Sequence, residues 1–345
     1  MGITKDDFRT DNPADYADCG VIDPLDESNP SLEGRGTRVT IKGENDVVLA
    51  DIIIGKPYEG RENFRLVRVP GQKRVYGTRI DLDLSTRFKD WIESDLMQID
   101  QKEIDRIVIK DYSIDERTGR IRKHDEITLE KKADQWEMDR VPAGKELERW
   151  KVTNLLRAID ELSIEGVRPK PAGLSASLRR AEGDQRITDA DLLSLQSKGF
   201  YFTRDGMLVS NEGELVVHAK DGVEWTLRFG EVARSDAGES KDASGENRYL
   251  MITASFDPSQ FPEPEKPSNT DFESKPDSTW TQEDWRNKGL QTAWEQWKRK
   301  VDEATERARK LSDRFADWYY VISNDSFEKL HVKREDLLRD KPAAG

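Results

Sequence analysis

The sequence contains few of the residues that build disulfides, metal clusters or membrane spans. Its 345 residues include a single cysteine, Cys19, and three histidines. One cysteine excludes an internal disulfide and a cysteine-rich zinc site. No run of about 18 apolar residues occurs, so we expect no segment of this sequence to span a bilayer. Residues 1–20 are acidic and lack an apolar core, which argues against a signal peptide.

Apolar residues are also scarce, and acidic residues outnumber basic ones. Only 35% of the residues are hydrophobic, 36% are charged, and the formal net charge is −13. That charge disfavours binding to nucleic acid and to anionic lipid headgroups, because both depend on Lys and Arg. The 9 Trp, 8 Tyr and 11 Phe argue against a disordered chain. We therefore expect folded units joined by polar segments.

Motifs for nucleotide, calcium or serine-nucleophile chemistry are missing as well. His124, His218 and His331 each lie in or beside a predicted strand, with no second histidine or cysteine at ligand spacing. A structural or surface role is expected for each. Asp81 and Asp83 flank Leu82 and are interpreted as a solvated face or a helix cap. We predict no catalytic, cofactor-binding or metal-binding residue, and no cofactor.

Composition and periodicity divide the chain into segments. Residues 1–36 carry nine acids, three bases and three prolines, and are interpreted as an acidic extended lead-in whose patch 19–22 can dock on the fold. Period-two strands begin at Thr37. We expect a first α+β unit over 37–145, a second over 146–340, and a tail over 341–345. The second unit contains an insertion, with loops over 233–280 and a long helix over 281–318.

The fold class predicted from this pattern is α+β, with two related units of antiparallel β-meander plus helices. The relation between the units is a weak internal repeat. Residues 39–55 and 215–230 both read as strand, turn, strand and glycine, and residues 318–337 echo 64–84. A helix with an apolar face is also expected from Ser85 to Leu96.

The long helix has an apolar seam without a break. Its members are alternately four and three residues apart, which is a heptad pattern: Leu290, Trp294, Trp297, Val301, Ala304, Ala308, Leu311, Phe315 and Trp318. Packing on the chain's own domain is favoured, because large tryptophans fit poorly in a tight two-stranded coil. The alternative is a partner-binding coiled coil. For that case the candidate contact residues are Trp294, Trp297, Val301, Leu311 and Phe315.

Several phrases together resemble a known bacterial family. They include residues 20–26 (GVIDPLD), 34–40 (GRGTRVT), 54–57 (IGKP), 166–171 (GVRPKP) and 314–323 (RFADWYYVIS). The sequence resembles the family called domain of unknown function 4340 from about residue 14 to 338. Members are associated with auxiliary components of gliding-motility-type ABC transporters. The resemblance implies an extracytoplasmic envelope protein, anchored by an N-terminal helix that lies outside this sequence, and it supplies no catalytic residue.

These observations favour a non-enzymatic envelope module that acts as a scaffold or contacts membrane-associated protein partners, as an accessory to a membrane transport system. No nucleic-acid partner is expected. The first alternative is a small-molecule or glycan binding module, with Trp280 or Trp285 as stacking platforms. A weaker alternative is a hydrolase that uses carboxylates.

Overall fold

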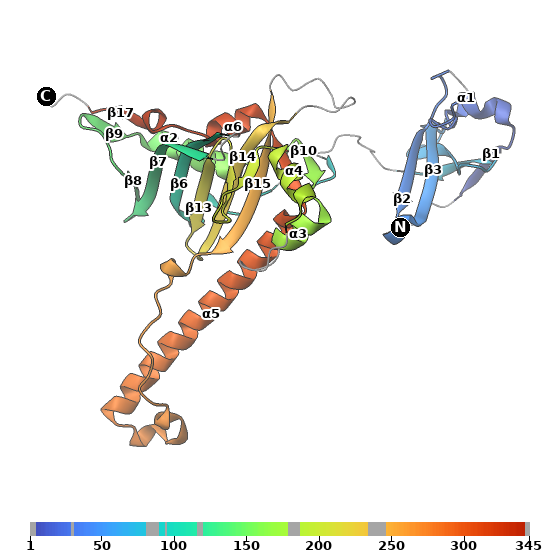
Figure 1. The fold of residues 1–345 in the computed structure, drawn as a ribbon. Coiled ribbons are helices and arrows are strands. Elements are labelled where there is room, and N and C mark those ends of the chain that lie inside the picture. Colours follow the sequence, from blue (N-terminus) through green and yellow to red (C-terminus); the bar gives the residue numbers. More distant parts are fainter. Residues whose placement is uncertain are drawn as a thin grey trace. The chain divides into compact units, whose positions relative to one another are not determined.

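The computed structural model describes residues 5–28, 31–80, 90–93, 95–115, 120–178, 187–233 and 246–341. The chain divides into two compact units, Met1–Thr86 and Arg87–Gly345 (Figure 1). The division falls well before the boundary at 145/146 that the sequence suggested. The reason is that the strands between residues 104 and 138 belong to the large sheet of unit 2.

Unit 1 is built on a five-stranded antiparallel sheet with strand order β1-β5-β4-β3-β2. Strands β2 to β5 form a meander in which each strand pairs with the next along the chain. Its elements are β1 (Asp7–Thr10), η1 (Pro13–Asp15), α1 (Tyr16–Cys19), β2 (Thr37–Lys42), η2 (Glu44–Asp46), β3 (Val48–Pro57), β4 (Phe64–Arg68) and β5 (Val75–Arg79).

The acidic segment before Thr37 is part of this unit and is not an extended lead-in. Strand β1 pairs with β5, and the short helix α1 follows it. Cys19 and Val21 are buried in one core cluster with Ile53, Leu66 and Val75. The prediction of an extended segment over 1–36 is therefore wrong for its described residues, although the patch that begins at Cys19 docks as expected. Its few apolar side chains supply core contacts while the acids remain near the surface.

Unit 2 is built on an eight-stranded antiparallel sheet with strand order β10-β16-β15-β14-β13-β6-β7-β8. Two further two-stranded pairs, β11-β12 and β17-β9, accompany it. The strands are β6 (Ile104–Asp115), β7 (Arg120–Lys132), β8 (Gln135–Met138), β9 (Lys145–Leu147), β10 (Gly166–Pro169), β11 (Phe200–Phe202), β12 (Leu208–Ser210), β13 (Glu214–Ala219), β14 (Val223–Ala233), β15 (Asn247–Phe256), β16 (Trp318–Ile322) and β17 (Leu338–Asp340).

The two faces of this sheet pack against different elements, because successive side chains of a strand point to opposite faces. On β15, Leu250 and Ile252 join the main core, while Met251 joins a second cluster. The main core is completed by side chains of α2 (Arg149–Asp160), α5 (Gln282–Ala316) and α6 (Asn324–Leu330). The second cluster is completed by α3 (Ala172–Leu178), α4 (Asp189–Gln196) and the β11-β12 pair.

The α+β class and the long helix are confirmed. Helix α5 begins after the N-cap Thr281 and spans 35 residues, so it is roughly 52 Å long. Its C-terminal half lies on the large sheet, with Ala308, Leu311 and Phe315 in the main core. Its N-terminal half extends beyond the sheet (Figure 1).

Two finer expectations have different outcomes. The expected correspondence between residues 64–84 and 318–337 does not hold. Strand β4 is followed by its hairpin partner β5, whereas β16 is followed by helix α6. Half of the expected helix from Ser85 to Leu96, residues 85–89 and 94, lies outside the described residues. Its described end forms no α-helix and places Leu96 in the main core.

Candidate functional site

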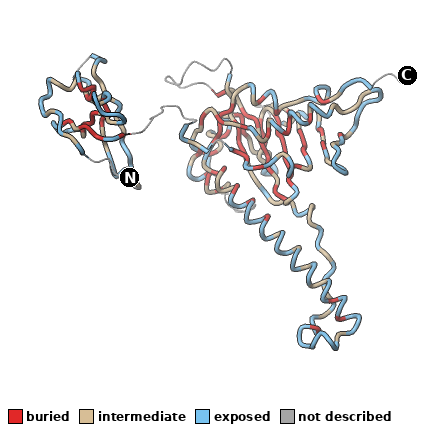
Figure 2. Tube along the Cα trace, turned by 180° about the vertical axis from the view of Figure 1, so that it is seen from behind, coloured by how far each residue is buried: buried red, intermediate tan, exposed pale blue. Residues whose placement is uncertain are grey.

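The most distinctive feature of unit 2 is a projecting arm, which we define as residues 257–303. It consists of the first part of α5 and a strap, residues 257–280, that runs back along the helix (Figure 1). The strap contains three 3₁₀ turns, η5 (Pro258–Gln260), η6 (Asp271–Ser274) and η7 (Asp277–Thr279). Exposed and half-buried residues dominate the arm, with buried residues again at its far end (Figure 2).

Hydrogen bonds from two tryptophans of the seam fasten the strap to the helix. The indole Nε1 of Trp297 donates to the carbonyl of Phe261 at 2.9 Å. The Nε1 of Trp294 donates to Glu263 Oε1 at 3.3 Å. Both tryptophans are half-buried by this arrangement. The strap thus partly covers the apolar seam of α5 where the helix extends beyond the sheet.

A small aromatic cluster forms the tip of the arm, which we define as residues 268–288. Phe272 is 1% exposed and packs edge-to-face against Trp280. The ring of Trp285 meets Trp280 at a centroid distance of 4.7 Å, also edge-to-face. Trp285 nevertheless remains 57% exposed. The two tryptophans therefore form no common flat platform, and one of them is presented to solvent.

Polar contacts hold the tip in place. Thr281 and Asp284 form a reciprocal capping box at the start of α5. Lys275 Nζ lies 2.9 Å from Asp284 Oδ1. Hydrogen bonds from Thr281, together with the Lys275 ammonium, lower the pKa of Asp284 to about 2. The amide oxygen of buried Asn287 accepts a hydrogen bond from Ser268 N at 3.1 Å.

The five candidate contact residues of the long helix separate into two groups. Trp294, Trp297 and Val301 are half-buried on the arm. Leu311 is 5% exposed and Phe315 is 1% exposed, and both belong to the main core of unit 2. These last two residues pack internally, because the large sheet covers the C-terminal half of the seam. They are not accessible to a partner in this fold.

The three histidines have different surroundings. His124 is exposed, and its Nε2 lies 3.0 Å from Ser113 Oγ. His331 is half-buried and stacks on Phe327. His218 is 5% exposed and lies on strand β13 inside the sheet.

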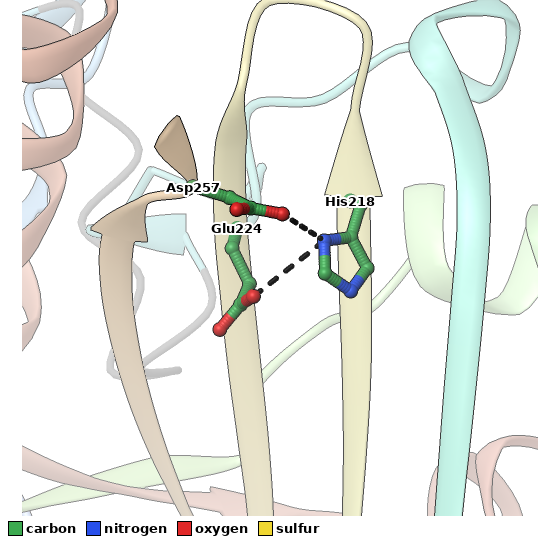
Figure 3. Close-up of side chains that lie close together, drawn as sticks. All are labelled: His218, Glu224 and Asp257. Atoms are coloured by element: carbon green, nitrogen blue, oxygen red, sulfur yellow. Dashed lines mark ion pairs between the residues drawn. The ribbon is translucent and has the colours of Figure 1, made fainter. Parts of the chain in front are cut away.

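His218 faces two carboxylates, and together they form the polar cluster drawn in Figure 3. Its Nδ1 lies 3.5 Å from Glu224 Oε2 and 3.5 Å from Asp257 Oδ2. Glu224 is the cross-strand neighbour of His218 in the β13-β14 pair, and Asp257 follows the last residue of β15. Among the described residues, this cluster is the one group of three His, Cys, Asp or Glu side chains arranged to hold a metal ion.

Burial controls the protonation of this cluster. Burial lowers the pKa of His218, and the positive charge of Arg106 lowers it further. Burial raises the pKa of Glu224. Burial alone would raise the pKa of Asp257, but hydrogen bonds from Ser259 lower the pKa of that carboxyl below its usual value. The cluster therefore combines a neutral imidazole with an ionised aspartate near neutral pH. Sequence reasoning missed it because the three residues have no motif spacing and meet only through strand register.

Cys19 carries no sign of nucleophilic chemistry. It is buried in the unit 1 core, and burial raises the pKa of its thiol. Asp81 and Asp83 lie outside the described residues. In the part of the chain that the structure describes, no helix is both long enough and apolar enough to cross a membrane.

The fold and these features define an antiparallel α+β protein of two units, one of which carries a helical arm. The chain belongs to the family described as a domain of unknown function (DUF4340), whose model matches residues 1–177. No curated protein and no solved structure matches the chain. The family match covers unit 1 and continues into α3 of unit 2, so the arm and the His218 cluster lie outside it.

Proposed function

We propose that this protein is a non-enzymatic protein-interaction or scaffold module of the bacterial cell envelope, on the extracytoplasmic side, and an accessory to a membrane transport system. The arm is the element that contacts the membrane-associated partner. The family membership supports the envelope and transport setting, since the resemblance described above implies it. The contact role of the arm is supported by its geometry.

The observation that carries this proposal is the exposed Trp285 on an ordered tip. Tryptophan is among the residues that contribute most to protein–protein binding energy. Here it is held by Trp280 and by the capping box that precedes it. Because the tip is already ordered, association does not have to order it. A tryptophan presented at the end of a projecting helix is well suited to enter a pocket on a partner.

Site-specific photocrosslinking in native membranes tests this proposal. A photoreactive amino acid replaces Trp285 in the full-length protein, and the cross-linked products are identified by mass spectrometry. Trp150 offers a matched control, because it is also 57% exposed but lies on α2, away from the arm. We expect position 285 to cross-link to a subunit of a membrane transport system and position 150 not to do so.

Two results would count against the proposal. One is the absence of any cross-link from position 285 in folded protein. The other is equal cross-linking of the same protein from both positions, since that would indicate proximity without a specific contact. A change in tryptophan fluorescence on addition of soluble glycans, lost in Trp285→Ala, would instead favour the glycan-binding alternative.

A further inference from the structure

The buried imidazole of His218 has an unsatisfied nitrogen. Its Nδ1 is fully enclosed and has no hydrogen-bond partner. The two nearest carboxylate oxygens are each 3.5 Å away, which exceeds the usual hydrogen-bond length of about 2.7–3.2 Å. A buried polar atom left without a partner destabilises the fold, because the loss of its hydration is not compensated. One imidazole nitrogen and two carboxylate oxygens, all capable of binding a metal, thus face a common point.

The separations match the edges of a metal coordination polyhedron. Zinc binds imidazole nitrogen and carboxylate oxygen at about 2.0–2.2 Å, so two ligand atoms of a tetrahedral site are about 3.3–3.5 Å apart. The nitrogen of His218 lies 3.5 Å from each oxygen. All three ligand atoms lie within 4.8 Å of one another. The distances are too long for direct hydrogen bonds and suitable for a shared cation.

Outer hydrogen bonds orient Asp257, and strand pairing places the other two ligands opposite each other. The other oxygen of Asp257, Oδ1, accepts hydrogen bonds from the backbone N of Ser259 at 3.0 Å and from its hydroxyl at 2.6 Å. Oδ2 is thereby turned toward His218 (Figure 3). Outer hydrogen bonds of this kind orient the ligands of known metal sites. Glu224 and His218 are fixed by the register of the β13-β14 pair.

The charges around the cluster favour a divalent cation on balance. Two carboxylates supply formal negative charge, although burial raises the pKa of Glu224 and so disfavours its charged form. Arg106, the neighbour of His218 on β6, opposes a cation, but its side chain is exposed and can remain in solvent. Lys110 lies further along β6 and pairs with Glu214.

We propose that His218, Glu224 and Asp257 bind a divalent transition-metal ion of the Zn²⁺ class. One imidazole and two carboxylates favour Zn²⁺ or Co²⁺ over Mg²⁺ and Ca²⁺, which prefer oxygen donors alone. Three protein ligands leave a position for water or for a donor from elsewhere. Asp257 is the first residue of the strap, so the metal joins the base of the arm to the β13-β14 hairpin.

Direct titration with the metal alone tests this site. The full chain is treated with a chelator, exchanged into metal-free buffer and titrated with CoCl₂ and ZnCl₂, following the visible absorption of Co²⁺ and the heat of Zn²⁺ binding. We expect one ion per chain. We expect at least tenfold weaker binding in His218→Gln, Glu224→Gln and Asp257→Asn. Asp257→Asn keeps an oxygen that can accept from Ser259, which limits damage to the fold.

His124→Gln is the matched control, because His124 is exposed on strand β7 of the same sheet and lies outside the cluster. It should bind the metal as the unchanged protein does. Circular dichroism verifies that each variant is folded. The proposal is overturned if the unchanged protein binds no stoichiometric ion. It is equally overturned if folded cluster variants retain full affinity, or if His124→Gln abolishes binding. An ion bound only at other residues would give one of these results.

Discussion

Two glutamates on neighbouring strands, buried Glu214 and half-buried Glu224, show how differently one residue type can be used. The carboxylate of Glu214 has three partners. Lys110 Nζ lies 2.7 Å from its Oε1, Arg228 Nε lies 3.3 Å from its Oε2, and the hydroxyl of Tyr112 donates a hydrogen bond to it. Glu224 has no such set of cations, and burial raises its pKa. The first arrangement is a satisfied structural cluster. The second leaves capacity for a ligand.

Truncation of Glu214 should therefore be costly. Glu214→Ala leaves the largely enclosed Arg228 without its carboxylate, and we expect a loss on the order of 3 kcal/mol in the free energy of unfolding. Chemical denaturation measures it. Glu130→Ala on β7 is the control, because Glu130 forms an exposed pair with Lys132 and should cost less than about 1 kcal/mol. Equal losses in the two variants would contradict this account.

Asp284 makes the tip of the arm sensitive to acid. The pKa of this carboxyl is lowered from 3.8 to about 2 by Thr281 and Lys275. A depressed pKa contributes stability that is complete above the unfolded value and is lost as the pH falls through the folded value. We expect the tip to remain ordered from neutral pH to about 4, and to loosen between about 4 and 2. Tryptophan fluorescence, to which Trp280 and Trp285 contribute, follows this change.

The variant Asp284→Asn provides the comparison for that titration. It keeps the size of the side chain but removes the charge that attracts Lys275. We expect a looser tip at neutral pH and a flat fluorescence profile between pH 4 and 2. A profile identical to that of the unchanged protein would show that another group causes the acid transition.

At the scale of the element, the two halves of α5 depend on different forces. The C-terminal half is stabilised by the sheet beneath it, whereas the arm depends more on helix propensity and on its strap. Gly289 lies in the arm, and a Cβ added there would meet nothing within 4 Å. We expect Gly289→Ala to stabilise the arm by about 0.5–1 kcal/mol, because alanine is the better helix former. Hydrogen exchange of the arm amides measures the gain.

Gly230 on β14 should respond in the opposite way. A Cβ at that position would lie 2.1 Å from the carbonyl oxygen of Lys198, so the backbone would have to move. We expect Gly230→Ala to lower the melting temperature of unit 2. If both glycine substitutions shifted stability in the same direction, local space would not be the deciding factor.

Elements with a strong local period could be predicted from the sequence, and their partners could not. The seam of α5 and the strands β13 to β15 follow spacings of 3.5 and 2 residues, which are visible in a single segment. Strand β1 was missed because four residues rich in charge show no such period. The His218 cluster was missed because Glu224 and Asp257 reach it through register and through a strand end, which spacing along the chain does not reveal.

At the scale of the molecule, each unit has core clusters composed of its own residues. Ile53 is fully buried in unit 1, and Leu227 is fully buried in unit 2. Replacement of either residue by alanine should cost about 2–5 kcal/mol. We expect Ile53→Ala to raise hydrogen exchange in β3 to β5 and to leave β13 and β14 protected, and Leu227→Ala to do the reverse. Loss of protection in both units from one substitution would contradict independent folding.

The unit boundary was the main error at this scale, and its cause is physical. Periodicity locates strands but does not state which sheet they join. Strands β6 to β8 come soon after unit 1 along the chain, yet β6 pairs with β13, about a hundred residues later. The family match at residues 1–177 crosses the same boundary. Sequence similarity and compact folding units therefore divide this chain at different places.

The strand order of the large sheet has a consequence for how the protein is made. Strand β10 pairs with β16, which is the last strand of that sheet to leave the ribosome. The residues of unit 1 are all translated by residue 86, but the large sheet of unit 2 cannot be completed before residue 322 has been translated. At about 5–20 residues per second, the early strands wait on the order of ten seconds or more with unpaired edges. During biosynthesis, β6 and β10 are thus the strands with most need of chaperone protection, because their partners β13 and β16 are translated much later.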